Sequence, residues 1–187
     1  MDRKFALENG ISDYEDLIDE LHVDVVVEDG DVIQAGDMRF IALSLPGHTR
    51  CSMGFYEAER KLLLSCETPG VFDGESVVVP SYLVGYQMAL DSIDRMERLD
   101  IEQILLPHLG LMNRKQTAAY LKLAQKSAVE TAQEIVQLLK NGGTHEAAVE
   151  YLRQKFYHGR IREAYPPAAF ALNAGIKVKL IEKELIR

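Results

Sequence analysis

Three short segments of this chain place a histidine or a carboxylate directly after an apolar run of strand length. His48 follows a Pro-Gly turn, Glu67 follows a leucine-rich run and Cys66, and His108 follows a proline at the end of a third run. Loops at strand ends commonly display binding and catalytic side chains, and glycine permits backbone conformations that other residues avoid. These segments are therefore the candidates for chemistry.

Two imidazoles and a carboxylate are suitable ligands for zinc, iron or manganese. We expect His48, Glu67 and His108 to form a metal site, provided that their strands end at one edge of a sheet. Spacing alone leaves other roles open, because the three residues lie far apart and no His-x-His pair occurs. These roles are a turn histidine bonded to backbone for His48, an exposed acid for Glu67 and a helix cap for His108.

Composition narrows the class of protein. Of the 187 residues, 47% are hydrophobic and 27% are charged, as in ordinary soluble domains. The formal net charge of −8 argues against nucleic-acid binding, which needs clustered Lys and Arg. Two cysteines are too few for a disulfide scaffold. Without a secretory signal or an apolar run of membrane-spanning length, we expect a cytoplasmic protein with no membrane partner.

The elements that must position these residues are strands and turns in the first half of the chain. An amphipathic pattern predicts a helix at residues 13–21, and a β-branched run predicts a strand at residues 23–27. Turn residues between apolar runs predict two hairpins, at residues 32–45 and 52–65. Residues 70–86 contain glycines, a proline and aromatics without clear periodicity, which predicts a long connection lying over a site.

The remaining elements are one strand and several helices. Helical spacing of apolar residues predicts a helix at residues 86–99, and a strand follows at residues 101–107. Beyond it, the pattern predicts three helices, at residues 116–139, 144–157 and 168–186. We therefore predict two units, residues 1–113 and 114–187. We expect the second to be a packing or dimerisation appendage rather than part of a site.

Several landmarks resemble, in order and spacing, the C-terminal half of the metallo-β-lactamase superfamily. That family has a strand D-G-D-x-I-x-x-G, a P-G-H-T turn, a strand ending in G-D-T and a final P-x-H-G. The corresponding residues here are Asp29-Gly30-Asp31, Ala35-Gly36-Asp37, Pro46-Gly47-His48-Thr49, Ser65-Cys66-Glu67-Thr68 and Pro107-His108. The resemblance covers residues 21–112. It implies an α+β fold, part of an αββα sandwich, to which a C-terminal helical segment is added.

The resemblance also implies a function, that of a hydrolase with a small-molecule substrate. Family members are metal-dependent hydrolases in which metal-activated water attacks an ester, thioester or lactone bond, using one or two ions, commonly zinc and otherwise iron or manganese. His48 resembles the third histidine of the first metal site. Glu67 occupies the position of the aspartate that bridges two metals, and His108 occupies that of the last histidine, which serves the second metal.

The chain departs from the family pattern in ways that leave alternatives open. Glu67 is one methylene longer than aspartate, and Cys66 replaces a glycine, where it either crowds the site or acts as a soft ligand. The ligand motif H-x-H-x-D-H occurs nowhere in the sequence. The chain is thus expected to be incomplete and inactive alone, as a truncation, a split subunit or a degenerate relative. The alternatives are a non-catalytic interaction module and a di-iron electron-transfer or oxygen-reducing relative.

Half of a sandwich would leave an apolar sheet face and open strand edges in water. Exposed apolar faces and open strand edges are commonly buried against another polypeptide. We therefore expect a homo-oligomer, or a chain paired with its missing N-terminal half.

Overall fold

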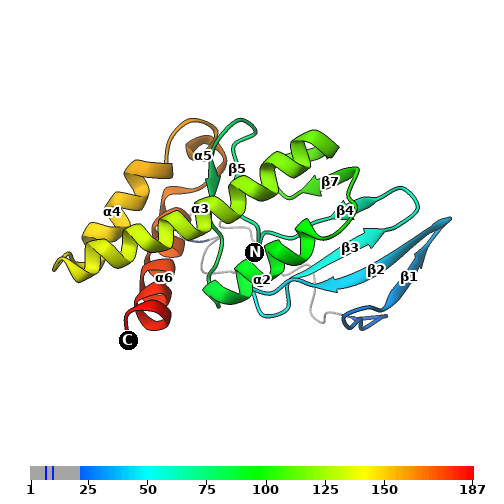
Figure 1. The fold of residues 1–187 in the computed structure, drawn as a ribbon, viewed down its shortest axis with the longest axis horizontal. Coiled ribbons are helices and arrows are strands. Elements are labelled where there is room, and N and C mark those ends of the chain that lie inside the picture. The colour runs from blue at the N-terminus through cyan, green and yellow to red at the C-terminus, as the bar shows by residue number, and fades with distance from the viewer. Residues whose placement is uncertain (1–6, 8–9, 11–21) are drawn as a thin grey trace.

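The computed structural model describes residues 7, 10 and 22–187, so the helix expected at residues 13–21 lies outside the described residues. Its largest element is a six-stranded sheet in the order β1-β2-β3-β4-β7-β8 (Figure 1). All neighbouring strands are antiparallel except β4 and β7, which are parallel. The strands are β1 (Val32–Ala35), β2 (Met38–Ser44), β3 (Met53–Glu57), β4 (Leu62–Leu64), β7 (Gln103–Leu106) and β8 (Gly110–Asn113).

Both expected hairpins are present. Strands β1 and β2 are joined through Gly36, whose φ of 64° lies in the left-handed region that glycine enters without strain. Strands β3 and β4 pair with Phe55 opposite Leu64. Turn residues and β-branched runs are local signals, which is why the sequence predicts these two hairpins correctly.

Three differences from the expected strands share one cause. Residues 23–27 form no strand, although they are β-branched. Strand β8 and a two-stranded sheet of β5 (Val71–Phe72) and β6 (Val78–Val79) are additions to the expected strands. A strand exists only where a neighbour completes its hydrogen-bond ladder, and none of the described strands pairs with residues 23–27. Pairing with distant residues, rather than local propensity, decides all three cases.

One face of the sheet is covered by helices α2 (Tyr86–Glu97) and α3 (Arg114–Lys140), which lie in front of the strands in Figure 1. The cross-strand register aligns one side chain from each of β2, β3, β4, β7 and β8 on this face. That row consists of Ile41, Tyr56, Leu63, Ile104 and Met112. It packs against Ile93 and Met96 of α2 and Tyr120 and Leu121 of α3, forming the first of two buried clusters.

The C-terminal residues form the predicted helical segment. Helices α4 (His145–Phe156), α5 (Gly159–Ala164) and α6 (Pro167–Leu185) pack with the second half of α3 in a second buried cluster. That cluster also contains Val71, Val79 and Tyr82 from the connection between β4 and α2. The fold is therefore α+β with a C-terminal helical segment, and the boundary at residue 113 stays a prediction.

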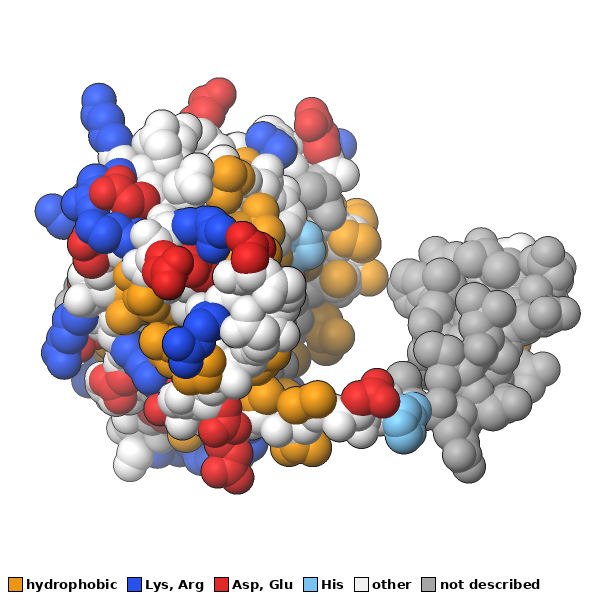
Figure 2. Space-filling model, turned by 90° about the vertical axis from the view of Figure 1, so that its right-hand side faces the viewer, with side chains coloured by type: hydrophobic (Ala, Val, Ile, Leu, Met, Phe, Trp, Pro, Cys, Tyr) orange, Lys and Arg blue, Asp and Glu red, His pale blue; other side chains and the backbone are white. Residues whose placement is uncertain are grey.

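The surface carries both signs of charge. Figure 2 shows Lys and Arg side chains interspersed with Asp and Glu on the face that it presents. Among the described residues, no helix is both long enough and apolar enough to cross a bilayer.

Candidate metal centre

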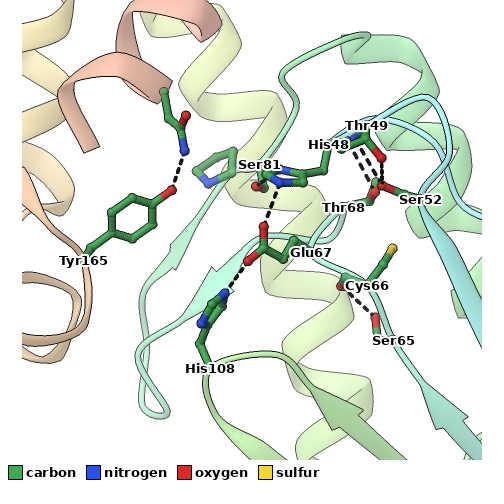
Figure 3. A network of polar contacts seen from close by, with 12 residues as sticks. His48, Thr49, Ser52, Ser65, Cys66, Glu67, Thr68, Ser81, His108 and Tyr165 are labelled. Atoms are coloured by element: carbon green, nitrogen blue, oxygen red, sulfur yellow. Dashed lines mark hydrogen bonds and ion pairs between the residues drawn. The ribbon is translucent and has the colours of Figure 1, made fainter. Parts of the chain in front are cut away.

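The three candidate ligands lie together at one edge of the sheet, beyond the ends of β2, β4 and β7 (Figure 3). Glu67 lies between the two histidines. Its Oε2 is 2.7 Å from Nε2 of His48, and its Oε1 contacts Nε2 of His108. Each carboxylate oxygen thus faces one imidazole, and three segments that are distant in the sequence converge on one point.

His48 is held by a backbone turn that only glycine can make. Gly47 has a φ of 141°, and a Cβ at this position would lie 2.7 Å from Cα of Ala89 in α2. Its carbonyl accepts hydrogen bonds from the N–H groups of Leu83 and Val84. The turn is therefore held between α2 and the segment that leads into α2. These contacts fix the backbone position of His48.

Thr68 ties the His48 turn to the end of β4. Its hydroxyl donates to the carbonyl of Leu45 over 2.6 Å and accepts the N–H of His48 over 3.3 Å. Because Thr68 is buried and follows Glu67 directly, this pair of bonds fixes the spacing between two of the candidate ligands.

The electrostatics of the site favour a charged carboxylate. Hydrogen bonding from His48, and then from His108, lowers the pKa of Glu67 to about 2 against the opposing effect of burial. Cys66 behaves differently. Its Sγ lies 3.8 Å from the carbonyl of Leu45 and points away from Glu67 in Figure 3, and burial raises the pKa of its thiol. A half-buried thiol with a raised pKa stays protonated and packs as a small apolar side chain, which does not favour a role as a soft ligand.

His108 adopts an uncommon backbone conformation. Its φ of 66° lies in the left-handed region, which non-glycine residues rarely enter, and its side chain is 50% exposed. Such conformations cost about 1–3 kcal/mol and cluster at functional sites. The strain here aims the imidazole back at Glu67 from the turn between β7 and β8.

Ser81 belongs to the site, although no sequence motif marks it. Its Oγ lies 2.8 Å from Nδ1 of His48, on the side of the ring opposite Glu67. Ser81 lies within the connection at residues 70–86 that is expected to pass over a site, but serines are common in such connections. Only the fold shows that this serine contacts the histidine ring.

A pocket of about 230 Å³ opens beside Glu67 and His108. Val71, Tyr165 and Pro166 complete its lining. The hydroxyl of Tyr165 accepts a hydrogen bond from Nδ2 of Asn173 over 2.5 Å and lies across the pocket from the candidate ligands (Figure 3). The junction of α5 and α6 supplies one wall of this pocket, although the C-terminal helices are expected to be a packing or dimerisation appendage rather than part of a site.

The donor set fits a metal in its chemistry, with two imidazole nitrogens and a carboxylate. Among the described residues, no three His, Cys, Asp or Glu side chains are grouped tightly enough to hold one ion as they stand. The hydrogen-bonded pairs must open for an ion to enter, because the ligand atoms of one ion lie farther apart than hydrogen-bonded atoms. His48, Glu67 and His108 would be the residues that hold the metal, and their ligand roles stay a prediction.

No family model matches the chain. It is 28% identical to the acyl-coenzyme A thioesterase MBLAC2 of Gallus gallus over 97 residues, which make up 49% of this chain and 33% of that protein. It is 36% identical to MBLAC2 of Homo sapiens over 53 residues, covering 28% of this chain and 18% of that protein. The matched segments therefore span a third or less of these relatives.

Solved structures share the fold. A metallo-beta-lactamase family protein of Thermus thermophilus aligns with a TM-score of 0.60 at 18% identity, covering 96% of this chain and 58% of that one. The sec-alkylsulfatase Pisa1 of Pseudomonas sp. aligns with a TM-score of 0.56 at 11% identity, covering 87% of this chain and 26% of that one. The chain therefore shares the fold of a metallo-beta-lactamase family protein, and its matched segments are similar to parts of MBLAC2.

Proposed function

We propose that this chain contributes a metal centre and an acyl-binding pocket to a metal-dependent hydrolase. The observation that carries the proposal is the position of Glu67, whose two carboxylate oxygens each face Nε2 of a different histidine. Two imidazole nitrogens and a carboxylate are a donor set that would suit a divalent metal ion.

In the proposed centre, His48, Glu67 and His108 hold zinc, or iron or manganese in its place. A bound divalent ion polarises a carbonyl oxygen and lowers the pKa of water towards neutrality. The chain itself holds the ligands ready. Ser81 bonds to Nδ1 of His48 and leaves Nε2 facing the centre, and the low pKa of Glu67 keeps its carboxylate ionised.

We propose an acyl thioester as the substrate, with an ester or lactone as the nearest alternatives. Val71, Tyr165 and Pro166 form an apolar wall suited to an acyl chain, and the relatives named above are acyl-coenzyme A thioesterases. The Tyr165 hydroxyl accepts from Asn173, so its own hydrogen is free to donate to the substrate carbonyl.

Three ligands are fewer than a two-metal centre requires. Since the sequence holds no H-x-H-x-D-H motif, we propose that another polypeptide segment supplies the remaining ligands and that this chain is inactive without it. The chain nevertheless retains half of the centre, and it should bind a metal weakly by itself.

The test is metal analysis followed by hydrolysis assays. The purified chain is dialysed against Zn²⁺, Mn²⁺ or Fe²⁺ and its metal content is measured for the wild type, His48→Ala and His108→Ala. His145→Ala is the matched control, because His145 bonds a carboxylate, Glu182, outside the site. We expect both site variants, but not the control, to lose metal. Acyl-coenzyme A hydrolysis is then measured with a complementing segment present, and metal retention by His48→Ala would refute the assignment.

One observation favours a second candidate, a non-catalytic interaction module. The carboxylate of Glu67 is already bonded to both histidines, so the three side chains satisfy one another without an ion. Under this alternative the wild type binds no metal, and Glu67→Gln lowers the thermal stability of the chain. Under the metal proposal, Glu67→Gln chiefly lowers metal content.

A further inference from the structure

Lys177 on α6 is a buried lysine without an acidic partner among the described residues. Its side chain is 5% exposed, and Ala174, Val178 and Ile181 of the same helix belong to the second buried cluster. Burial alone, with no opposing charge, lowers the pKa of this amine to about 7. Its hydrogen bond is donated by Nζ to the carbonyl oxygen of Pro80, over 2.7 Å.

This arrangement costs stability. Burying an amine among apolar side chains with a single hydrogen bond is less favourable than burying a methionine of similar volume. The apolar residues of α6 already hold this helix in place. Stabilising α6 therefore does not explain why a lysine is buried here.

The acceptor of Lys177 lies next to the metal centre. Pro80 follows β6 and precedes Ser81, whose Oγ is 2.8 Å from Nδ1 of His48. On the far side of the imidazole, Nε2 of His48 meets Glu67. A continuous series of polar contacts thus runs from the buried amine of α6 to the candidate ligand, through one peptide group and one hydroxyl.

We propose that Lys177 is a positioning residue, which fixes the Pro80–Ser81 peptide and thereby orients the imidazole of His48 for ligand binding. The inference rests on the proposed metal function for its purpose, but the contacts themselves do not require a metal. Groups that orient the second nitrogen of a ligating histidine typically change metal affinity by about 10–100-fold when they are removed.

The first experiment observes His48 directly and needs no metal. Histidine ring-nitrogen NMR signals are compared for the wild type, K177M, S81A and the double variant K177M/S81A, with the His48 signals assigned from H48Q. K179M is the matched control, because Lys179 lies on the same helix and is exposed. We expect K177M to displace the His48 signals in the same direction as S81A, and K179M to leave them unchanged.

The double variant separates positioning from a general structural role. If Lys177 acts through Ser81, K177M/S81A shifts the His48 signals no further than S81A alone. Shifts that add, or a K177M spectrum identical to that of the wild type, would overturn the proposal. K177Q serves if K177M does not fold, because its side chain is one atom shorter and should leave the Pro80 carbonyl without its donor.

The second experiment measures zinc affinity by competition with a chromophoric chelator. We expect K177M and S81A to bind zinc about tenfold more weakly than the wild type and K179M. A wild type that binds no zinc refutes the metal function, while the ring-nitrogen spectra still decide the role of Lys177. If a folded K177M variant binds zinc as tightly as the wild type, the positioning role of Lys177 is refuted and the proposed metal function is unaffected.

Discussion

At the scale of single residues, Gly47 has no space for a side chain. A Cβ there would meet both Cα and Cβ of Ala89 at 2.7 Å and Cγ2 of Thr68 at 2.8 Å, at a φ that side chains disfavour. We expect Gly47→Ala to lower the free energy of unfolding by about 3 kcal/mol or more, and to displace His48. Urea denaturation measures the stability change, and zinc affinity reports the displacement.

Gly36 is the matched control for Gly47. It also has a positive φ, of 64°, but a Cβ there would meet nothing within 4 Å. Gly36→Ala should therefore cost only the backbone strain, about 1–2 kcal/mol, with zinc affinity unchanged. Equal losses in the two variants would show that the close contact with α2 is unimportant.

Lys177 should also leave a signature in the pH dependence of stability. Burial lowers the pKa of Lys177 to about 7 in the folded chain, against 10.5 as its ordinary value. Between these limits the unfolded chain binds the proton and the folded chain does not, so the lysine favours folding increasingly as pH rises. We expect the free energy of unfolding of the wild type, relative to that of K177M, to rise by up to about 1.4 kcal/mol per pH unit between about pH 7 and 10. Urea midpoints measured for both proteins across this range provide the test, and a constant difference would contradict it.

The residues of the site show what a sequence can and cannot reveal. His48, Glu67 and His108 are identifiable because each follows an apolar run, and a strand end is a local feature. Ser81, Tyr165 and Lys177 are not, because their roles depend on which distant segment each one contacts. The same distinction separates the hairpins, which the sequence predicts, from strand β8, whose existence depends on pairing with β7.

Among the elements, α6 supports α2 at a critical point. Helix α2 begins after Gly85, which provides no side-chain cap, and its first N–H groups need acceptors. Oε2 of Glu184, near the end of α6, accepts from the N–H of Tyr86 over 3.1 Å. The C-terminal helices thus hold in place the helix against which the Gly47 turn packs.

Removing this cap should weaken α2. We expect Glu184→Ala to lower the free energy of unfolding by about 1 kcal/mol, as loss of a helix cap usually does. Glu130→Ala is the control, because Glu130 makes only a long, exposed contact with Lys126 within α3 and should cost a few tenths of that. Hydrogen exchange at the Tyr86 amide localises the effect, and unchanged protection there would show that Glu184 does not cap α2.

At the scale of the whole molecule, the sheet has two unlike faces. The face opposite α2 and α3 carries another apolar row set by the strand register: Ala42, Phe55, Leu64, Leu105 and Leu111. Leu105 and Leu111, on the last two strands, are 42% and 57% exposed. A row of this kind is typical of a surface that is buried in an assembly. We therefore expect a partner, either a second copy of the chain or a missing half, to bind at this row.

We therefore expect the wild type to associate through this row. Sedimentation should give a mass above the 21.0 kDa of one chain, while L105K/L111K should sediment as a monomer, because two charges on adjacent strands prevent apolar burial. L172K is the matched control, since Leu172 is 65% exposed on α6, away from the sheet. A wild type that stays monomeric leaves the row free for a complementary half, so adding a segment with the missing ligands should then protect Leu105 and Leu111 from solvent. If neither association nor protection occurs, the exposed row has no structural partner, and a metal centre completed across this face is excluded.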